Sequence, residues 1–362
     1  LGLAGWIKAD TSVNQEVLDK PLQWASGGLS STSDLVNYRP VALRPALETL
    51  KGGESKHFLH PQALALSIDF FLKTDAPAAE ALSKQVEVLK QALSTTQEEQ
   101  LLTALEYYAS TLAAGERLPD LPLYDYLKIA AAIAHCIENG NGNVRLAGGN
   151  ISGIQDYLYD ILSKRASKLL KGRSFYLQLL SYSLVETILE YFSLSPCHVV
   201  YSSGGGFYVL MPDNDAVKEK FNHYSKSITK KIYARHGTAL FVDFALSKSV
   251  DQTRSADSIW DELFQGLNEN KNKRFSDDED ILRQLLEGYV EHGGEGNAGR
   301  DEITNEEIND PKELDFIGTE EDRITVSKFT KGQIEKLGKN LRDANYWIVS
   351  KNPGFHAEAF ED

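Results

Sequence analysis

The sequence feature that most constrains the fold of this chain is a glycine-rich segment typical of a β-hairpin. The segment CHVVYSSGGGFYVLMP contains two β-rich runs separated by Ser-Ser-Gly-Gly, and glycine permits the positive φ angles of a tight turn. A strand-like run from Val144 and a long amphipathic stretch come before it, and a helical stretch and the strand-like run TALFVDFALSK come after it. The order strand, helix, two strands, helix, strand predicts an α+β fold with a ferredoxin-like (βαββαβ) domain of about 100 residues.

Helical periodicity dominates the sequence before this domain. The stretches PAAEALSKQVEVLKQAL, EEQLLTALEYYASTLAAG and LYDYLKIAAAIAHCIENGNG predict amphipathic helices, the second of which is stopped by Gly115. Near the other end, a helix running to Ala344 and a strand at Tyr346–Ser350 are predicted. We therefore expect a helical domain over 1–142, the ferredoxin-like domain over 143–275, an acidic connector over 276–325, and a helix–strand segment over 326–362 that leads to a missing or lost C-terminal domain.

Negative charge is concentrated in the connector. The stretch from Asp277 to Asp322 carries 17 acidic and 3 basic residues, a balance of −14, which equals the formal net charge of the whole chain. A generally basic nucleic-acid-binding protein is thereby disfavoured, although a local basic patch is compatible with this balance. The acidic stretch predicts a solvated, partly irregular connector, with an acidic binding surface as the less favoured alternative.

Few residues suited to bind a metal stand close together in the sequence. Cys136 and Cys197 are far apart and form no CxxC, which argues against a disulfide scaffold and fits a reducing compartment. His135 is expected to be a core or capping histidine, and the pair His57 and His60 lacks further ligands nearby. No metal site is predicted. With no apolar run near the length of about 20 residues that a membrane span needs, we expect a cytoplasmic protein without membrane contact.

A ferredoxin-like sheet with a glycine hairpin is also the palm of nucleotide polymerases and cyclases. Such palms hold two divalent metals on carboxylates at the end of the first strand and in the central hairpin. Here Asn150 ends the first strand, and the hairpin has only serine and glycine, while Asp156 and Asp160 are expected in the following helix. The sequence therefore predicts no catalytic residue and no two-metal centre in this palm.

Binding of a nucleotide is the other chemistry open to the hairpin. Three successive glycines expose backbone N–H groups that can cradle an anion, and neighbouring serines add hydroxyl donors. A tight turn without a ligand explains the same string equally well, because glycine-rich loops are weak signals. The predicted nucleotide-binding residues are Asn150, Ser202, Ser203, Gly204, Gly205 and Gly206.

A basic stripe is the second candidate site. The stretch Ile161–Val185 has no acidic residue, and its lysines follow helical spacing. A contact with RNA or nucleotide phosphates is favoured over a merely solvated face. The residues expected to contact phosphate are Lys164, Arg165, Lys168, Lys171 and Arg173.

These strings resemble a known family. GGNISGIQDYLYDILSKRASKLLKGRSFYLQLL and YSSGGGFYVLMPD are similar to the first palm of the large polymerase/cyclase-like subunit of type III CRISPR effector complexes, most like the Csm (III-A) version. LPLYDYLKIAAAIAHCI resembles the helix before that palm, and LGKNLRDANYWIVS resembles the segment toward later domains. The matches span residues 121–350.

The resemblance implies a ribonucleoprotein subunit. The family assembles on a guide RNA, senses a target RNA, cuts single-stranded DNA with a His-Asp nuclease domain, and makes cyclic oligoadenylate from ATP between two palms. This sequence departs from that pattern: Tyr126 stands where the family often has histidine, Asn150 stands where aspartate is typical, and neither a Gly-Gly-Asp-Asp motif nor a four-cysteine ribbon occurs. The nuclease is expected to be lost.

Three functions remain open at this point. The preferred one is a structural scaffold in an RNA-guided antiviral complex, with a non-catalytic palm that binds ATP; guide RNA, target RNA and the small, stem-handle-binding and backbone subunits would be its partners. The second is the N-terminal part of an active cyclic-oligoadenylate synthetase, for which ATP with Mg²⁺ is expected only if a second palm is present. The third is a stand-alone nucleotide-sensing module.

Overall fold

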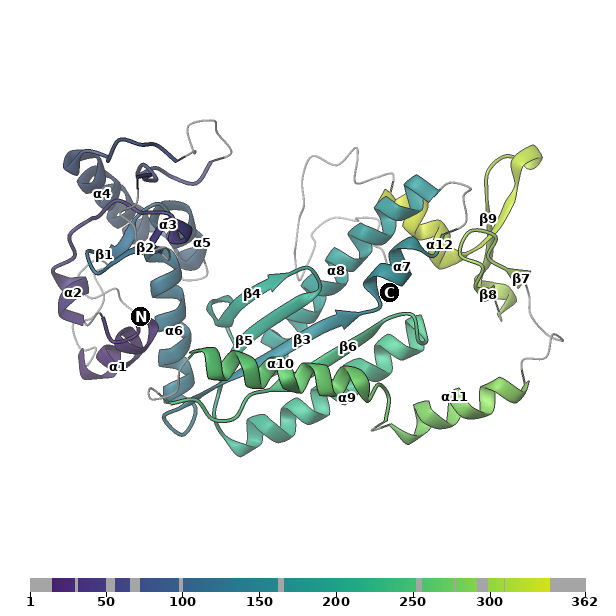
Figure 1. The fold of residues 1–362 in the computed structure, drawn as a ribbon. Helices are drawn as coiled ribbons and strands as arrows, with labels where there is room; N and C mark the ends of the chain where they lie inside the picture. The colour runs from purple at the N-terminus through teal and green to yellow at the C-terminus, as the bar shows by residue number, and fades with distance from the viewer. Residues whose placement is uncertain are drawn as a thin grey trace.

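We describe the chain from a computed structural model, which defines residues 15–29, 32–49, 56–65, 72–97, 100–161, 166–251, 256–276, 278–291, 299–308 and 310–338. The structure mixes helices with small antiparallel sheets, as the α+β class predicts (Figure 1). Within these ranges no helix combines the length and the apolar character that crossing a bilayer requires.

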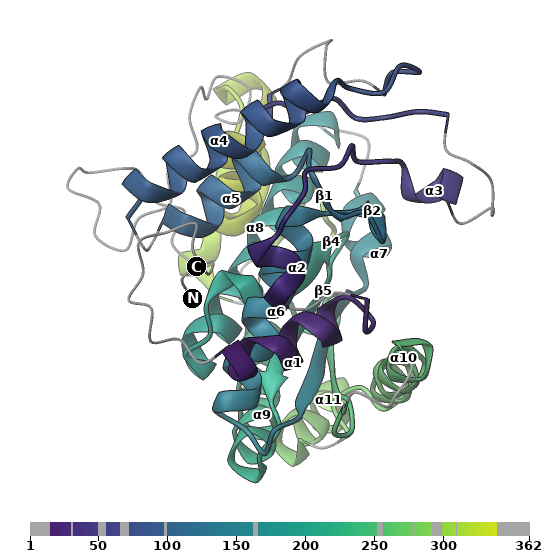
Figure 2. The same cartoon turned by 90° about the vertical axis from the view of Figure 1, so that its left-hand side faces the viewer.

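Helices and a short hairpin make up the first part of the chain. They are α1 (Gln15–Ala25), α2 (Thr32–Val36), α3 (Ala46–Thr49), α4 (Ala79–Thr95), α5 (Leu101–Ala109), β1 (Ala113–Gly115), β2 (Leu118–Pro122) and α6 (Leu123–Glu138). The hairpin differs from the sequence expectation, because α5 ends at Ala109, a turn follows, and Ala113–Gly115 form strand β1. Ala113 and Ala114 are buried there, and small buried residues suit a strand as well as a helix. Figure 2 shows α6 between α1 and the central sheet.

The central sheet has four strands in the order β4-β5-β3-β6, and every neighbouring pair is antiparallel. The strands are β3 (Val144–Ser152), β4 (Val199–Ser203), β5 (Gly206–Pro212) and β6 (Phe241–Leu246). Helices α7 (Ile154–Tyr159) and α8 (Ala166–Phe192) and the 3-10 helix η3 (Pro196–His198) join β3 to β4, and α9 (Asp215–His236) joins β5 to β6. The predicted hairpin is confirmed: Gly204 and Gly205 form its turn with φ of 62° and 87°.

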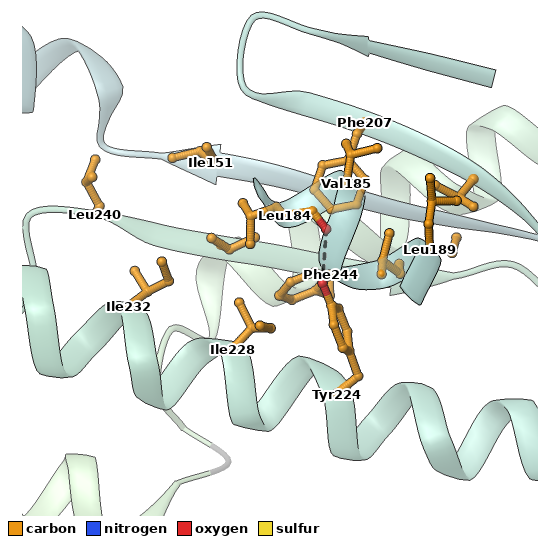
Figure 3. Packing of buried hydrophobic residues seen from close by; sticks show 14 of the residues in the cluster. Ile151, Leu184, Val185, Leu189, Phe207, Tyr224, Ile228, Ile232, Leu240 and Phe244 are labelled. Atoms are coloured by element: carbon orange, nitrogen blue, oxygen red, sulfur yellow. Dashed lines mark hydrogen bonds between the residues drawn. The ribbon is translucent and has the colours of Figure 1, made fainter. Parts of the chain in front are cut away.

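One face of this sheet carries the main core. Side chains from alternate strand positions, including Ile151, Phe207 and Phe244, pack against α8 and α9 (Figure 3). The Tyr224 hydroxyl on α9 donates to the Leu184 carbonyl on α8 at 3.2 Å, so the buried phenol keeps a partner. Helix α10 (Ala256–Asn272) covers the opposite face through a smaller apolar cluster. Strands β3 and β6 are therefore buried on both sides, whereas the end of the edge strand β4 is exposed.

Helix α8 runs without a break through Gly172, a position at which the sequence permits one helix or two. The glycine is needed for packing, since a Cβ there would lie 2.0 Å from the carbonyl oxygen of Gln333. Gln333 begins a π-helical turn η6 (Gln333–Leu337) that follows α12 (Lys328–Gly332). The close approach joins the last described part of the chain to the palm region.

The acidic segment is more ordered than its charge predicts. It contains α11 (Glu279–Glu291), β7 (Gly299–Arg300), β8 (Glu307–Ile308), η4 (Pro311–Glu313), β9 (Leu314–Ile317), η5 (Glu320–Asp322) and, just after it, β10 (Ile324–Ser327). Ile303, Ile317 and Ile324 pack with Leu169 of α8 in a separate apolar cluster. Isoleucines spaced among acidic residues therefore anchor part of the expected connector to α8. The predicted helix to Ala344 is described only as far as residue 338, and the predicted strand Tyr346–Ser350 lies outside the described residues.

Candidate functional site

Three polar side chains meet where β3 ends. Along β3, Ile151 faces the main core, so the alternation of a strand turns Asn150 and Ser152 to the face that α10 covers. Asn150 is directly paired with Asp243 on β6 and with Gly206 on β5. Asp243 follows the same alternation, because its neighbours Val242 and Phe244 lie in the main core. The sheet register thus brings an amide, a hydroxyl and a carboxylate together.

Asp243 is a buried carboxyl group with an incomplete set of partners. Only 1% of it is exposed, and the Ser152 hydroxyl donates a hydrogen bond to Oδ2. Within the described ranges its Oδ1 has no partner that meets hydrogen-bond geometry. Burial raises the pKa of Asp243, while the Ser152 hydrogen bond, the nearby Arg274 and Lys271, and the Asn150 side chain oppose that rise. Most buried acceptors in proteins have a hydrogen-bond partner, so an open oxygen at this position is unusual.

A cavity of about 420 Å³ opens beside these residues. Its wall includes Asn150 and Ser152, the exposed carboxylate of Asp156 on α7, and two basic residues, Lys271 at the end of α10 and Arg274 just after it. Two cations at the rim attract an anionic ligand, and a guanidinium can hold two phosphate oxygens at once. The complete lining is Asn150, Ile151, Ser152, Gly153, Ile154, Gln155, Asp156, Thr238, Ala239, Lys271 and Arg274.

The predicted nucleotide-binding residues divide into two groups. Asn150 lines the cavity, whereas the hairpin residues do not. Ser202, Ser203 and Gly204 are exposed at the hairpin, while Gly205 is buried and a Cβ there would lie 2.5 Å from Ile154. The Gly205 carbonyl also accepts a hydrogen bond from the Ile151 N–H at 2.9 Å. The structure therefore explains Gly205 by turn geometry and close packing, and leaves the exposed serines beside the cavity.

The basic stripe is described only in part. Lys164 and Arg165 lie outside the described residues, and Lys168 and Lys171 are exposed on α8. Arg173 does not belong to this exposed face: it is 3% exposed, and its guanidinium lies 4.6 Å from the ring centre of Tyr157. It also donates hydrogen bonds to the carbonyls of Tyr157 and Asp160. Arg173 holds α7 against α8 and has no exposed donor for a phosphate.

The remaining candidates from the sequence occupy structural positions. Tyr126 is 1% exposed in the core of the N-terminal part. His57 pairs with Glu48, and His60 lies 3.6 Å from the carboxylate of Asp75, so the two histidines face different partners. The N-terminal residues 1–14, where a nuclease motif is expected in the family, lie outside the described residues.

Sequence reasoning missed four polar residues on which the site is built: Ser152, Asp243, Lys271 and Arg274. Asp243 carried a readable signal, because a lone aspartate in the apolar run FVDFAL is unusual for a buried strand. Lys271 and Arg274 carried no such signal, since they fall in an ordinary charged helix end and reach the site only through the packing of α10 on the sheet.

Residues 143–288 match the family model for the Csm1 subunit domain B. The resemblance of this chain to the Cas10/Csm1 large subunit is therefore confirmed. A curated relative from Mycobacterium tuberculosis, described as a CRISPR system single-strand-specific deoxyribonuclease Cas10/Csm1 of subtype III-A, is 26% identical over 223 residues, which cover 51% of this chain and 27% of the relative. A relative of the same description from Thermococcus onnurineus is 31% identical over 137 residues, covering 33% of this chain and 18% of the relative.

Solved Csm1 structures share the fold. A Csm1–Csm4 subcomplex of the type III-A CRISPR-Csm interference complex gives a TM-score of 0.60 at 17% identity, covering 78% of this chain and 42% of that one. A Csm1–Csm4 cassette in complex with AMPPNP gives 0.59 at 19% identity, covering 74% and 38%. The chain spans about a quarter of the length of the curated relatives that it matches.

Proposed function

We propose that this chain serves as a large-subunit component of an RNA-guided type III CRISPR effector complex, and that the cavity beside Asn150 holds the phosphates of ATP. The cavity carries the proposal: Asn150, Ser152, Lys271 and Arg274 surround it on a domain that matches Csm1 domain B. Relatives solved with AMPPNP and with ATP support the choice of ligand.

The domain assignment is part of this proposal. Residues 143–275 would be a ferredoxin-like palm, for which the strand order β4-β5-β3-β6 and the two helical crossovers are the support. Residues 1–142 would be a helical domain derived from a nuclease domain, and the acidic part over 276–325 would link the palm to the segment 326–362. A Csm4-like subunit is the partner that the solved relatives suggest. We place this assembly, with guide and target RNA, in the cytoplasm of a prokaryote.

The residues at the cavity are suited to holding a nucleotide. Lys271 and Arg274 would balance the charge of the phosphates, and the Asn150 amide and Ser152 hydroxyl supply neutral hydrogen-bonding groups. Asp156, whose carboxylate is exposed at the wall, is an oxygen ligand suited to the Mg²⁺ that accompanies ATP. Asp243 is buried beneath Ser152 and is not part of the wall. We expect the chain alone to bind ATP without joining it into oligoadenylate.

A calorimetric titration of ATP into the chain tests the site. Charge reversal by Lys271→Glu with Arg274→Glu is expected to weaken binding at least about 10-fold, because it removes two charge-assisted contacts. Lys231→Glu, an exposed change on α9 away from the cavity, is the matched control and should leave affinity unchanged. Equal affinity in all variants would refute the phosphate site, and no binding to the wild-type chain would refute the nucleotide function.

A second assay distinguishes a non-catalytic scaffold from an active oligoadenylate synthetase. The chain is incubated with ATP and Mg²⁺ or Mn²⁺, and the products are separated by chromatography. The scaffold proposal expects ATP to remain intact. Oligoadenylate that disappears after substitution of Asp156 or of Ser203 and Gly205 would establish the synthetase alternative.

A further inference from the structure

A second cluster of polar side chains lies away from the cavity, where α6 meets the start of β4. It joins His135 and Cys136 at the end of α6 to His198 of η3. One ligand atom of each residue, a ring nitrogen or the thiol sulfur, lies within 4.8 Å of the other two. His198 lies 62 positions after Cys136 in the sequence, so the fold brings it to the other two residues.

The distances between these atoms suit one small cation. Zinc binds imidazole nitrogen at about 2.0–2.1 Å and thiolate sulfur at about 2.3 Å, which places tetrahedral ligand atoms about 3.3–3.8 Å apart. Nδ1 of His135 lies 3.0 Å from Nε2 of His198, with the rings nearly perpendicular at 87°. The ligand atoms would have to move by a few tenths of an ångström to about one ångström for all three to bind the same cation.

His198 is also held in the manner of a metal-binding histidine. Its Nδ1 lies 3.0 Å from the Ser195 carbonyl oxygen, an acceptor that requires a proton on that nitrogen. The tautomer so fixed leaves the lone pair on Nε2, which faces His135. Histidine ligands usually donate their other ring N–H to a carbonyl or carboxylate in this way. His198 is 1% exposed and Cys136 is fully buried, so neither ring nor thiol is free to turn toward solvent.

We infer that His135, Cys136 and His198 form a binding site for a zinc-like divalent cation. Two imidazoles and one thiolate are a ligand set that favours Zn²⁺ over Mg²⁺ or Ca²⁺, which prefer oxygen. Binding replaces the Cys136 thiol proton, which leaves to solvent, and the partly exposed side of His135 leaves a fourth position for water. The cation would fasten α6, a helix of the N-terminal part, to the segment that leads into the hairpin of the central sheet.

Cobalt titration of the full 362-residue chain tests the site, because Co²⁺ bound to thiolate has a charge-transfer absorption that ligands without sulfur do not give. We expect one equivalent of Co²⁺ to produce that absorption and Zn²⁺ to displace it. Cys136→Ser should abolish the charge-transfer band, and His135→Gln should weaken Zn²⁺ binding at least about 100-fold, as loss of a ligand exceeds the effect of second-shell changes.

Matched controls come from the same residue types. Cys197→Ser removes the neighbouring thiol, and His223→Gln removes an exposed histidine of α9; both should keep Zn²⁺ affinity within about threefold. Circular dichroism melting without metal verifies that each variant folds. His135 is only half buried, so His135→Gln is expected to fold. It therefore still tests the site if Cys136→Ser fails to fold. Absence of the cobalt band in the wild-type chain, or its loss with Cys197→Ser, would overturn the assignment.

Discussion

Two buried aspartates lie beside β3, one near each end, and their partners differ. Near the start of the strand, Asp213 accepts from Nε of Arg145 at 2.5 Å, and Arg145 also donates to the Ser247 carbonyl at 2.6 Å. Near the other end, Asp243 accepts from Ser152, and its other oxygen has no partner in the part of the chain that the structure describes. The first carboxylate belongs to an ion pair in which both charged groups are buried. The second has an open acceptor close to a cavity, so the two aspartates differ in how completely their surroundings satisfy them.

Breaking the completed pair should give the largest effect. Asp213→Asn leaves the Arg145 guanidinium buried without its counterion, which is expected to lower the free energy of unfolding by about 3–5 kcal/mol. Urea denaturation followed by circular dichroism measures the loss. A loss under about 1 kcal/mol would show that the pair does not organise this end of the sheet.

His236 should make stability depend on pH, because it lies half-buried among aromatic side chains at the end of α9. Burial lowers the pKa of His236 to about 4, and its Nε2 lies 2.8 Å from the Tyr176 hydroxyl. The unfolded chain therefore binds the proton first as pH falls, so stability is lost between about pH 6.5 and pH 4, by about 1 to 3 kcal/mol. His236→Gln should flatten the pH dependence of the melting temperature over that window. An unchanged slope would show that the histidine is already protonated in the folded chain.

Removing the charge of the incomplete site should have a small effect on stability. In Asp243→Asn the side-chain oxygen still accepts from Ser152, and burial already raises the pKa of the carboxyl group. We expect the free energy of unfolding to stay within about 1 kcal/mol of the wild type at pH 7, or to rise. Denaturation side by side with Asp213→Asn makes the comparison directly. Equal losses for both would contradict the distinction drawn between the two aspartates.

Charge reversal at the exposed lysines of α8 should weaken RNA binding without changing stability. Lys168→Glu with Lys171→Glu is expected to reduce the dependence of log K on log salt concentration by about 1 to 2, since each lost phosphate contact on single-stranded RNA contributes about 0.7. Fluorescence anisotropy across a salt series gives the slope. The same slope in the variant would make Lys168 and Lys171 ordinary solvated residues.

Local patterns predicted much of the fold. The Ser-Ser-Gly-Gly string predicted the β4–β5 turn because glycine adopts the two positive φ angles found at Gly204 and Gly205 without steric cost. The periodicity of α9 was readable because its buried residues lie on one face, and β6 was readable as a short apolar run rich in β-forming residues. These features depend on neighbours in the sequence.

Features that depend on packing between distant segments could not be predicted. Arg173 has the same charge as Lys171, but the helix turns it inward onto Tyr157. His135 and His198 meet across 63 residues, and Arg274 reaches the cavity only because α10 packs on the sheet. The packing of the acidic segment on α8 could not be predicted for a related reason, because its charge balance says nothing about the few isoleucines that are buried there.

The central claim is that ATP phosphates bind at the β3 end of the sheet. A crystal structure of the chain with AMPPNP tests it most directly. Our account predicts phosphate density in the cavity, within hydrogen-bonding distance of Lys271 and Arg274 and near Asn150. Phosphates seated only on Ser202–Gly206, with the cavity unchanged, would contradict it.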